Sequence, residues 1–114
     1  MSIAAFKRSM TEAAMEDAVR QVVTRLGGRV YHVRRSDQAP EMVDFPDLVV
    51  ILPNRSVVAF VELKSQTRRV TDGQHEVMEM LSLCDAVVSA IVRPEPKGNE
   101  WSYDELMDWL QGEH

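Results

Sequence analysis

The sequence has little of several features that mark particular classes of protein. Its 114 residues include one cysteine, Cys84, so no internal disulfide can form and there is no cysteine spacing for zinc. No apolar run approaches the roughly 18 residues of a membrane span, and the first residues lack the long apolar core of a secretory signal. These absences argue against secreted and membrane proteins. We expect a cytoplasmic protein in which Cys84 is a buried packing residue.

The excess of negative charge lies at the C-terminal end. The net charge is −5, and beyond Arg93 six acidic residues face only Lys97, so this tail accounts for the whole excess (1 − 6 = −5). Residues 1–94 are therefore electrically balanced, and the net charge does not argue against a nucleic-acid substrate. A chain of this length forms one core with no room for a second catalytic module. We divide it into a core domain, residues 1–94, and an acidic helical appendage, residues 95–114.

Hydrophobic periodicity predicts a helix, three strands, a second helix and a further strand. Ser9-Met-Thr-Glu12 has the pattern of a capping box, and the apolar stripe after it ends at Gly27-Gly28, a usual helix terminus. Alternation predicts a strand at residues 29–34, before a polar loop with two prolines. The elements expected after the loop are strands 48–52 and 57–64, a helix from Thr71 to about Leu83, a strand 86–92 and a short acidic helix 102–111.

This order predicts an α/β fold with an αβββαβ mixed sheet flanked by helices, plus a short C-terminal helix. Pro53-Asn-Arg-Ser56 has turn chemistry, so the strands on either side of it should form an antiparallel hairpin. A hairpin brings the start of its first strand beside the end of its second. We therefore expect Asp47 and Glu62 to lie near each other.

The charged residues at that end of the hairpin are the candidates for chemistry. Glu62 and Lys64 are two apart on a strand, so their side chains leave the same face. Burying such charges is unfavourable unless they serve each other or a cation. The carboxylates of Asp47 and Glu62 and the backbone carbonyl of Leu63 are oxygen ligands of the kind that Mg²⁺ prefers. We expect Lys64 to orient a water molecule or to stabilise negative charge at phosphorus, although a purely structural Glu–Lys pair stays an alternative.

Five features stand in order along the chain: a helical acid at Glu16, Gly27-Gly28, Pro46-Asp47, Glu62-Leu63-Lys64 and Gln74. This ordered set resembles the PD-(D/E)XK nuclease superfamily, most closely its VRR-NUC branch of small phage-type and repair nucleases, over residues 16–92. The resemblance implies a restriction-endonuclease-like core and hydrolysis of phosphodiester bonds with Mg²⁺, or with Mn²⁺ as a substitute. It implies catalytic roles for Glu16, Asp47, Glu62, Lys64 and Gln74, and metal ligation by Glu16, Asp47, Glu62 and Leu63.

For stand-alone members of this branch, the resemblance further implies a homodimer acting on branched DNA, as Holliday-junction resolvases do, without a small-molecule cofactor or a membrane. Two assignments have an alternative. Glu12 and Glu16 share a helix stripe, and Glu16 has the family spacing before the glycines, whereas Glu12 is explained as the capping acid of Ser9. Gln74 follows Thr71 by three residues, and we expect a capping role and a role in the site to exclude each other.

Basic residues around these segments are the expected DNA contacts. Four arginines fall on the loops that border the proposed site, with ordinary solvated surface charge as the alternative: Arg34, Arg35, Arg68 and Arg69. His32 and His75 are placed outside the site, because a metal ion and a lysine need neither. Trp101 and Trp109 are eight apart, so we expect them to attach the last helix to the body or to a partner subunit.

The leading hypothesis is a structure-selective, metal-dependent endodeoxyribonuclease. A second hypothesis is a catalytically silent nucleic-acid-binding or regulatory subunit with the same fold. A third is an interaction protein whose acidic tail mimics nucleic acid or fills a basic groove.

Overall fold

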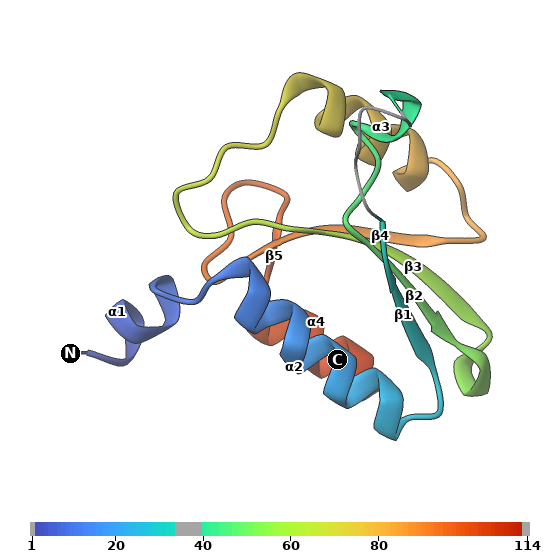
Figure 1. Cartoon of the computed structure of the whole chain (residues 1–114), viewed down its shortest axis with the longest axis horizontal. Coiled ribbons are helices and arrows are strands. Elements are labelled where there is room, and N and C mark those ends of the chain that lie inside the picture. Colours follow the sequence, from blue (N-terminus) through green and yellow to red (C-terminus); the bar gives the residue numbers. More distant parts are fainter. Residues whose placement is uncertain (1, 34–39, 113–114) are drawn as a thin grey trace.

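The computed structural model describes residues 2–33 and 40–112 and shows a mixed sheet with helices on both faces (Figure 1). In this part of the chain, five strands lie in the order β1-β2-β3-β4-β5, antiparallel from β1 to β3 and parallel from β3 to β5. The strands are β1 (Arg29–His32), β2 (Leu48–Leu52), β3 (Val57–Leu63), β4 (Val88–Arg93) and β5 (Trp101–Ser102). The helices are α1 (Ile3–Arg8), α2 (Glu12–Arg25), α3 (Asp72–Ser82) and α4 (Tyr103–Leu110), with 3₁₀ turns at Pro40–Met42 and Pro53–Arg55. The predicted αβββαβ order is confirmed.

The hydrophobic core lies between one face of the sheet and helices α2 and α4, which run side by side (Figure 1). Alternate residues of β2 and β3 face this core, because side chains along a strand alternate between the two faces. Helix α3 covers the opposite face and packs against β4. The most deeply buried apolar residues are Met15, Val19, Val23, Leu48, Val50, Leu52, Ala59, Val61, Leu63, Val92, Leu106 and Leu110.

The end of α2 fixes the path of the chain into β1. Gly27 has a φ of +80°, a conformation that glycine adopts without the clash that a Cβ would make. The amide of Gly28 donates to the carbonyl of Val23 over 2.9 Å, which satisfies one of the last carbonyls of the helix. Gly28 also passes so close to the carbonyl of Ile51 that a Cβ would overlap it. The predicted terminus is confirmed, and the close approach holds α2 against β2.

The predicted start of that helix is wrong by two residues. Thr11, not Ser9, is the N-cap, and its hydroxyl accepts a hydrogen bond from the amide of Ala14 over 3.0 Å. Ser9 instead ends the short helix α1, which the sequence did not predict. Glu12 is therefore the first residue of α2 and not the capping acid of Ser9, which leaves its carboxylate available to the site.

The C-terminal segment is packed into the core. Ser102 and Glu105 form a capping box at the start of α4, the predicted short acidic helix, and β5 adds a parallel strand beside β4. Leu106 and Leu110 are each 1% exposed and belong to the main apolar cluster. Helix α4 therefore packs into the core, and the division of the chain at residue 94 stays a prediction. Trp101 lies in β5 rather than on α4, with its ring 5.9 Å from that of Trp109.

Two further properties bear on the expectations drawn from composition. Cys84 is exposed rather than buried, because it lies beyond the last turn of α3 and not on the face that meets the sheet. Among the described residues, no helix has the length and apolar character needed to cross a bilayer.

The packing of α4 predicts the effect of truncating one side chain. Leu106→Ala should lower the free energy of unfolding by roughly 2–5 kcal/mol, the range for removing a buried leucine side chain. Asp108→Ala, on the exposed side of the same helix, should change it by less than about 0.5 kcal/mol. Urea unfolding of both variants measures this. Equal, small effects would mean that α4 is not part of the cooperative core.

Candidate nuclease site

The pairing of β2 with β3 brings together the acids at one end of the hairpin. Leu48 lies opposite Val61, so the same register sets Asp47 opposite Glu62. The carboxylate of Asp47 reaches across this end and accepts the backbone amide of Leu63 over 3.3 Å. The sequence expectation that Asp47 and Glu62 lie near each other is therefore met by the register of the sheet.

Glu62 and Lys64 form an ion pair inside the protein. Lys64 Nζ lies 3.3 Å from Glu62 Oε2, and the two side chains are 2% and 1% exposed. Both point to the sheet face opposite the main core, because Leu63 between them faces that core. A buried pair of charges gains little stability over apolar side chains of similar size, since desolvation offsets the attraction. Its presence here therefore favours a chemical role over a structural one.

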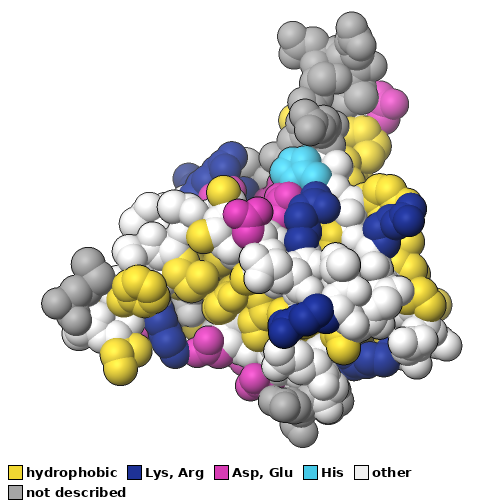
Figure 2. Space-filling model, turned by 60° about the horizontal axis from the view of Figure 1, so that its bottom comes forward, with side chains coloured by type: hydrophobic (Ala, Val, Ile, Leu, Met, Phe, Trp, Pro, Cys, Tyr) yellow, Lys and Arg dark blue, Asp and Glu magenta, His cyan; other side chains and the backbone are white. Residues whose placement is uncertain are grey.

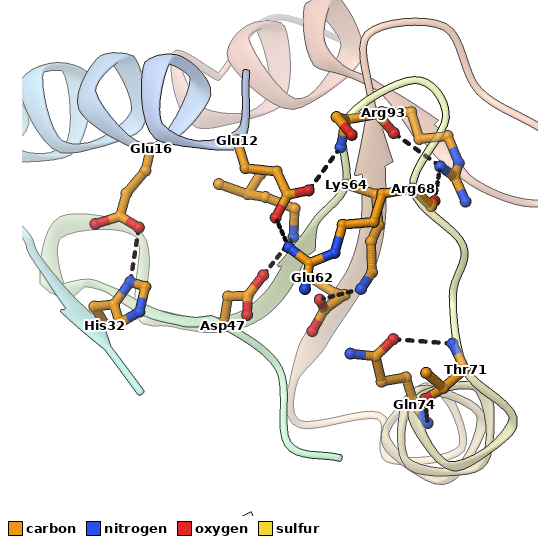
Figure 3. Close-up of polar contacts among 12 residues, drawn as sticks. Glu12, Glu16, His32, Asp47, Glu62, Lys64, Arg68, Thr71, Gln74 and Arg93 are labelled. Carbon is orange, nitrogen blue, oxygen red and sulfur yellow. Dashed lines mark hydrogen bonds and ion pairs between the residues drawn. The ribbon is translucent and has the colours of Figure 1, made fainter. Parts of the chain in front are cut away.

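Gln74 joins α3 to this arrangement. Its Oε1 accepts the backbone amide of Thr71 over 3.0 Å, while its own backbone amide donates to the hydroxyl of Thr71, so the predicted capping box is present. The cap uses only the oxygen of the amide. Figure 3 shows the amide nitrogen on the other side, pointing toward Lys64 and Glu62. The capping role of Gln74 is therefore confirmed, and its role in the site stays a prediction.

A pocket of about 340 Å³ opens where α2 begins and β2 and β3 meet. Its walls combine acidic groups with one histidine and one arginine, and on the face shown in Figure 2 acidic side chains lie beside a histidine and are flanked by Lys and Arg side chains. Glu62, Lys64 and Gln74 are buried and do not line it. The lining residues are Glu12, Ala13, Glu16, His32, Val33, Asp47, Leu63 and Arg68.

Glu12 connects α2 with the end of β3. One of its carboxylate oxygens accepts the amide of Ser65 over 3.1 Å, and the other lies 2.8 Å from Arg68 Nη1 (Figure 3). Ser65 directly follows Lys64, so Glu12 reaches the strand end that holds the lysine. The sequence argument that set Glu12 aside rested on a cap that does not exist.

Glu16 is held on the β1 side of the pocket. Its carboxylate lies 2.7 Å from His32 Nδ1 and 3.0 Å from Arg20 Nε. Burial raises the pKa of Glu16, but the hydrogen bonds from His32 and Arg20 outweigh it, so its pKa lies below the ordinary value. His32 thus lines the pocket, contrary to the sequence-based placement outside the site. No spacing along the chain relates His32 to Glu16, since their contact arises when β1 packs on α2.

The loop after β3 is fixed by an arginine that sequence patterns did not single out. Arg93 is 4% exposed, and its Nη1 donates to the carbonyls of Ser65 and Arg68 over 2.9 and 2.5 Å. Its Nε lies 2.7 Å from a carboxylate oxygen of Glu100, which is itself 10% exposed on its side chain. One buried cation therefore ties the loop beside the pocket to β4 and to the segment before β5.

The groups around the pocket suit a divalent cation in their chemistry. Carboxylate oxygens, a ligand type that Mg²⁺ and Mn²⁺ accept, come from α2 and from the start of β2, and Leu63 also lines the pocket. Within the described residues, no three His, Cys, Asp or Glu side chains are gathered closely enough to hold an ion. The acids instead contact amides, cationic side chains or a histidine of the chain, such as Arg68 on Glu12.

The four arginines predicted to contact DNA have different outcomes. Arg68 lines the pocket. Arg69 lies in a neighbouring groove with Arg68, Thr67, Asp72, His75 and Lys97. Arg34 and Arg35 fall outside the described residues.

Comparison with known proteins gives one match. A family model described as the VRR-NUC domain matches residues 7–92, which run from the end of α1 to Val92 in β4 and include all the acids of the pocket. Neither the curated proteins nor the solved structures contain a match to the chain.

The contacts of Arg93 predict that it stabilises the site as well as the fold. Arg93→Ala should lower the free energy of unfolding by about 3–5 kcal/mol, because it leaves Glu100 without its cation and two loop carbonyls without a donor. Lys7→Ala, which breaks the exposed pair with Asp104, should leave the free energy of unfolding almost unchanged. Denaturant unfolding compares the two, and faster amide exchange at residues 65–68 should appear in Arg93→Ala alone.

Proposed function

Because the chain belongs to the VRR-NUC domain family, a family of PD-(D/E)XK-like nucleases, we propose that it is an endonuclease that hydrolyses DNA phosphodiester bonds with a divalent metal ion. The observation that carries the proposal is the strand-end arrangement of Asp47, Glu62 and Lys64. Two acids and a buried ammonium group meet beside an acid-lined pocket at the end of β3.

The proposed metal ligands are Asp47, Glu62 and the backbone carbonyl of Leu63, together with a helical acid from α2. Mg²⁺, or Mn²⁺ in its place, would lower the pKa of a bound water and neutralise charge on the phosphate. The helical acid is Glu16 by the spacing of the family pattern. The contact of Glu12 with Ser65, next to Lys64, supports Glu12 for the same role.

Lys64 is proposed to hold the attacking water and to stabilise the negative charge that develops on phosphorus. Its side chain is 2% exposed and its ammonium group contacts Glu62, so its position is set before the substrate arrives. The amide nitrogen of Gln74 points toward the same place (Figure 3). We propose that Gln74 restrains Lys64 and Glu62 from the α3 side while its oxygen caps the helix.

The preference for branched DNA and the homodimer are proposed from the resemblance to stand-alone members of the family. Arg68 and Arg69, on the loop beside the pocket, are the proposed phosphate contacts on this chain. A catalytically silent subunit with the same fold is the competing function. The buried Glu62–Lys64 pair argues against it, because such a pair adds little stability without a chemical use.

The proposal predicts that DNA cleavage requires the negative charge of Asp47. Asp47→Asn keeps an oxygen that can accept the Leu63 amide but loses the negative charge, and should lower the cleavage rate about 10²–10³-fold. Asp17→Ala, an exposed acid on α2, should cleave as the natural protein does. Four-way junction, flap and linear DNA with Mg²⁺ or Mn²⁺ are the substrates to compare. Metal-independent DNA binding without cleavage of any of them would favour the silent subunit.

The two helical acids can be separated by paired substitutions. If Glu16 is the ligand, Glu16→Gln should lower cleavage about 10²-fold or more, and Glu12→Gln should have a smaller effect. The reverse order would assign the role to Glu12, which the contacts at Ser65 support. Cleavage rates measured over a range of Mn²⁺ concentrations identify the ligand, because its loss also raises the metal concentration needed.

A further inference from the structure

One cationic side chain of the protein already sits among the acids of the pocket. Arg68 Nη1 lies 2.8 Å from Glu12 Oε1, and Arg68 lines the pocket together with Glu12, Asp47 and Leu63. Figure 3 shows its guanidinium group directed into the space between the carboxylates of Glu12 and Asp47. A guanidinium in this position supplies positive charge where a metal ion would be needed.

The backbone of Arg68 is held firmly while its side chain is not. The carbonyl of Arg68 accepts a hydrogen bond from the buried Arg93, as does that of Ser65. Gln66 in the same loop exchanges two hydrogen bonds with the backbone of Glu95, over 2.9 and 3.1 Å. In contrast, the side chain of Arg68 is 58% exposed, and its contact with Glu12 is an exposed ion pair that contributes little energy. The guanidinium can therefore leave Glu12 without any movement of the loop.

A second place for this side chain lies next to the first. Arg68 borders both the acid-lined pocket and the neighbouring groove that contains Arg69 and Lys97. Apart from Arg68, that groove is lined by the cations Arg69, Arg93 and Lys97 and by the acids Asp72 and Glu100, of which Glu100 is already paired with Arg93. The cations outnumber the acids, so a DNA phosphate would be attracted to the groove and would give the guanidinium a partner there.

We propose that Arg68 is an internal counter-ion of the metal site: it neutralises Glu12 until a divalent cation binds in the pocket, and the cation releases it toward the groove for the DNA phosphate. This inference rests on the proposed function, and it adds regulation to the same site. In the described part of the chain no three ligating side chains are gathered closely enough to hold an ion, and Glu12 is engaged with a cation of the chain itself. Metal binding and phosphate binding then favour each other, because one side chain cannot serve Glu12 and DNA together.

The test is Mn²⁺ binding without DNA, measured by calorimetry on the full chain. Arg68→Ala removes the competing cation and should bind Mn²⁺ about two- to fivefold more tightly than the natural protein, the range set by one exposed ion pair. Arg69→Ala is the matched control, since it removes the same charge from the next residue, which does not line the acid pocket. Arg69→Ala should bind Mn²⁺ almost as the natural protein does. Thermal unfolding confirms that both variants fold.

A second readout follows the side chain itself. In a Mg²⁺ titration, the NMR resonance of the Arg68 guanidinium should shift as the site fills, and that of Arg69 should not. An equal gain in Mn²⁺ affinity in both variants, or an unchanged Arg68 resonance at saturating Mg²⁺, would overturn the proposed counter-ion role of Arg68. Either result would leave the nuclease proposal intact. Failure of every variant to bind either ion would overturn both inferences.

Discussion

The register between β2 and β3 is the constraint on which the site depends. It sets Asp47 opposite Glu62, and the alternation of side chains along β3 then places Lys64 beside Glu62 and Leu63 in the opposite layer. A shift of one residue would move Glu62 and Lys64 into the apolar core and Leu63 out of it, which is strongly unfavourable. The apolar residues that stabilise the hairpin therefore also fix the positions of its charged end.

Local patterns in the sequence were sufficient for most of the fold. Several of these patterns act over only a few residues, so they can be recognised without knowledge of the tertiary structure. They are the capping boxes at Thr71 and Ser102, the glycines after α2 and the turn at Pro53–Arg55. The same holds for the positions of Asp47, Glu62 and Lys64, which follow from one hairpin. The N-cap of α2 was misplaced because Ser9 and Thr11 are both good caps, and only the short helix before Ser9 decides between them.

The remaining features depend on contacts between distant segments. Three contacts form only after the sheet and helices have packed, and the spacing of the residues along the chain does not predict them. They are His32 with Glu16, Glu12 with the amide of Ser65, and Arg93 with the carbonyl of Arg68. The tail was misjudged for a similar reason. Its acidic composition suggested a separate element, whereas the apolar side of α4 is buried against α2. Composition averages over both faces of a helix, and packing uses only one.

Helix α1 differs from the rest of the molecule in how it is attached. It buries none of its residues and is joined to the body by two exposed ion pairs, Lys7 with Asp104 and Arg8 with Glu95, while Ile3 and Phe6 face solvent. At 1 M ionic strength the screening length shrinks to about 3 Å, so such pairs lose most of their attraction. The first turns of the chain should then separate from the body while the sheet stays folded, because the sheet is held by apolar packing, which charge screening does not weaken.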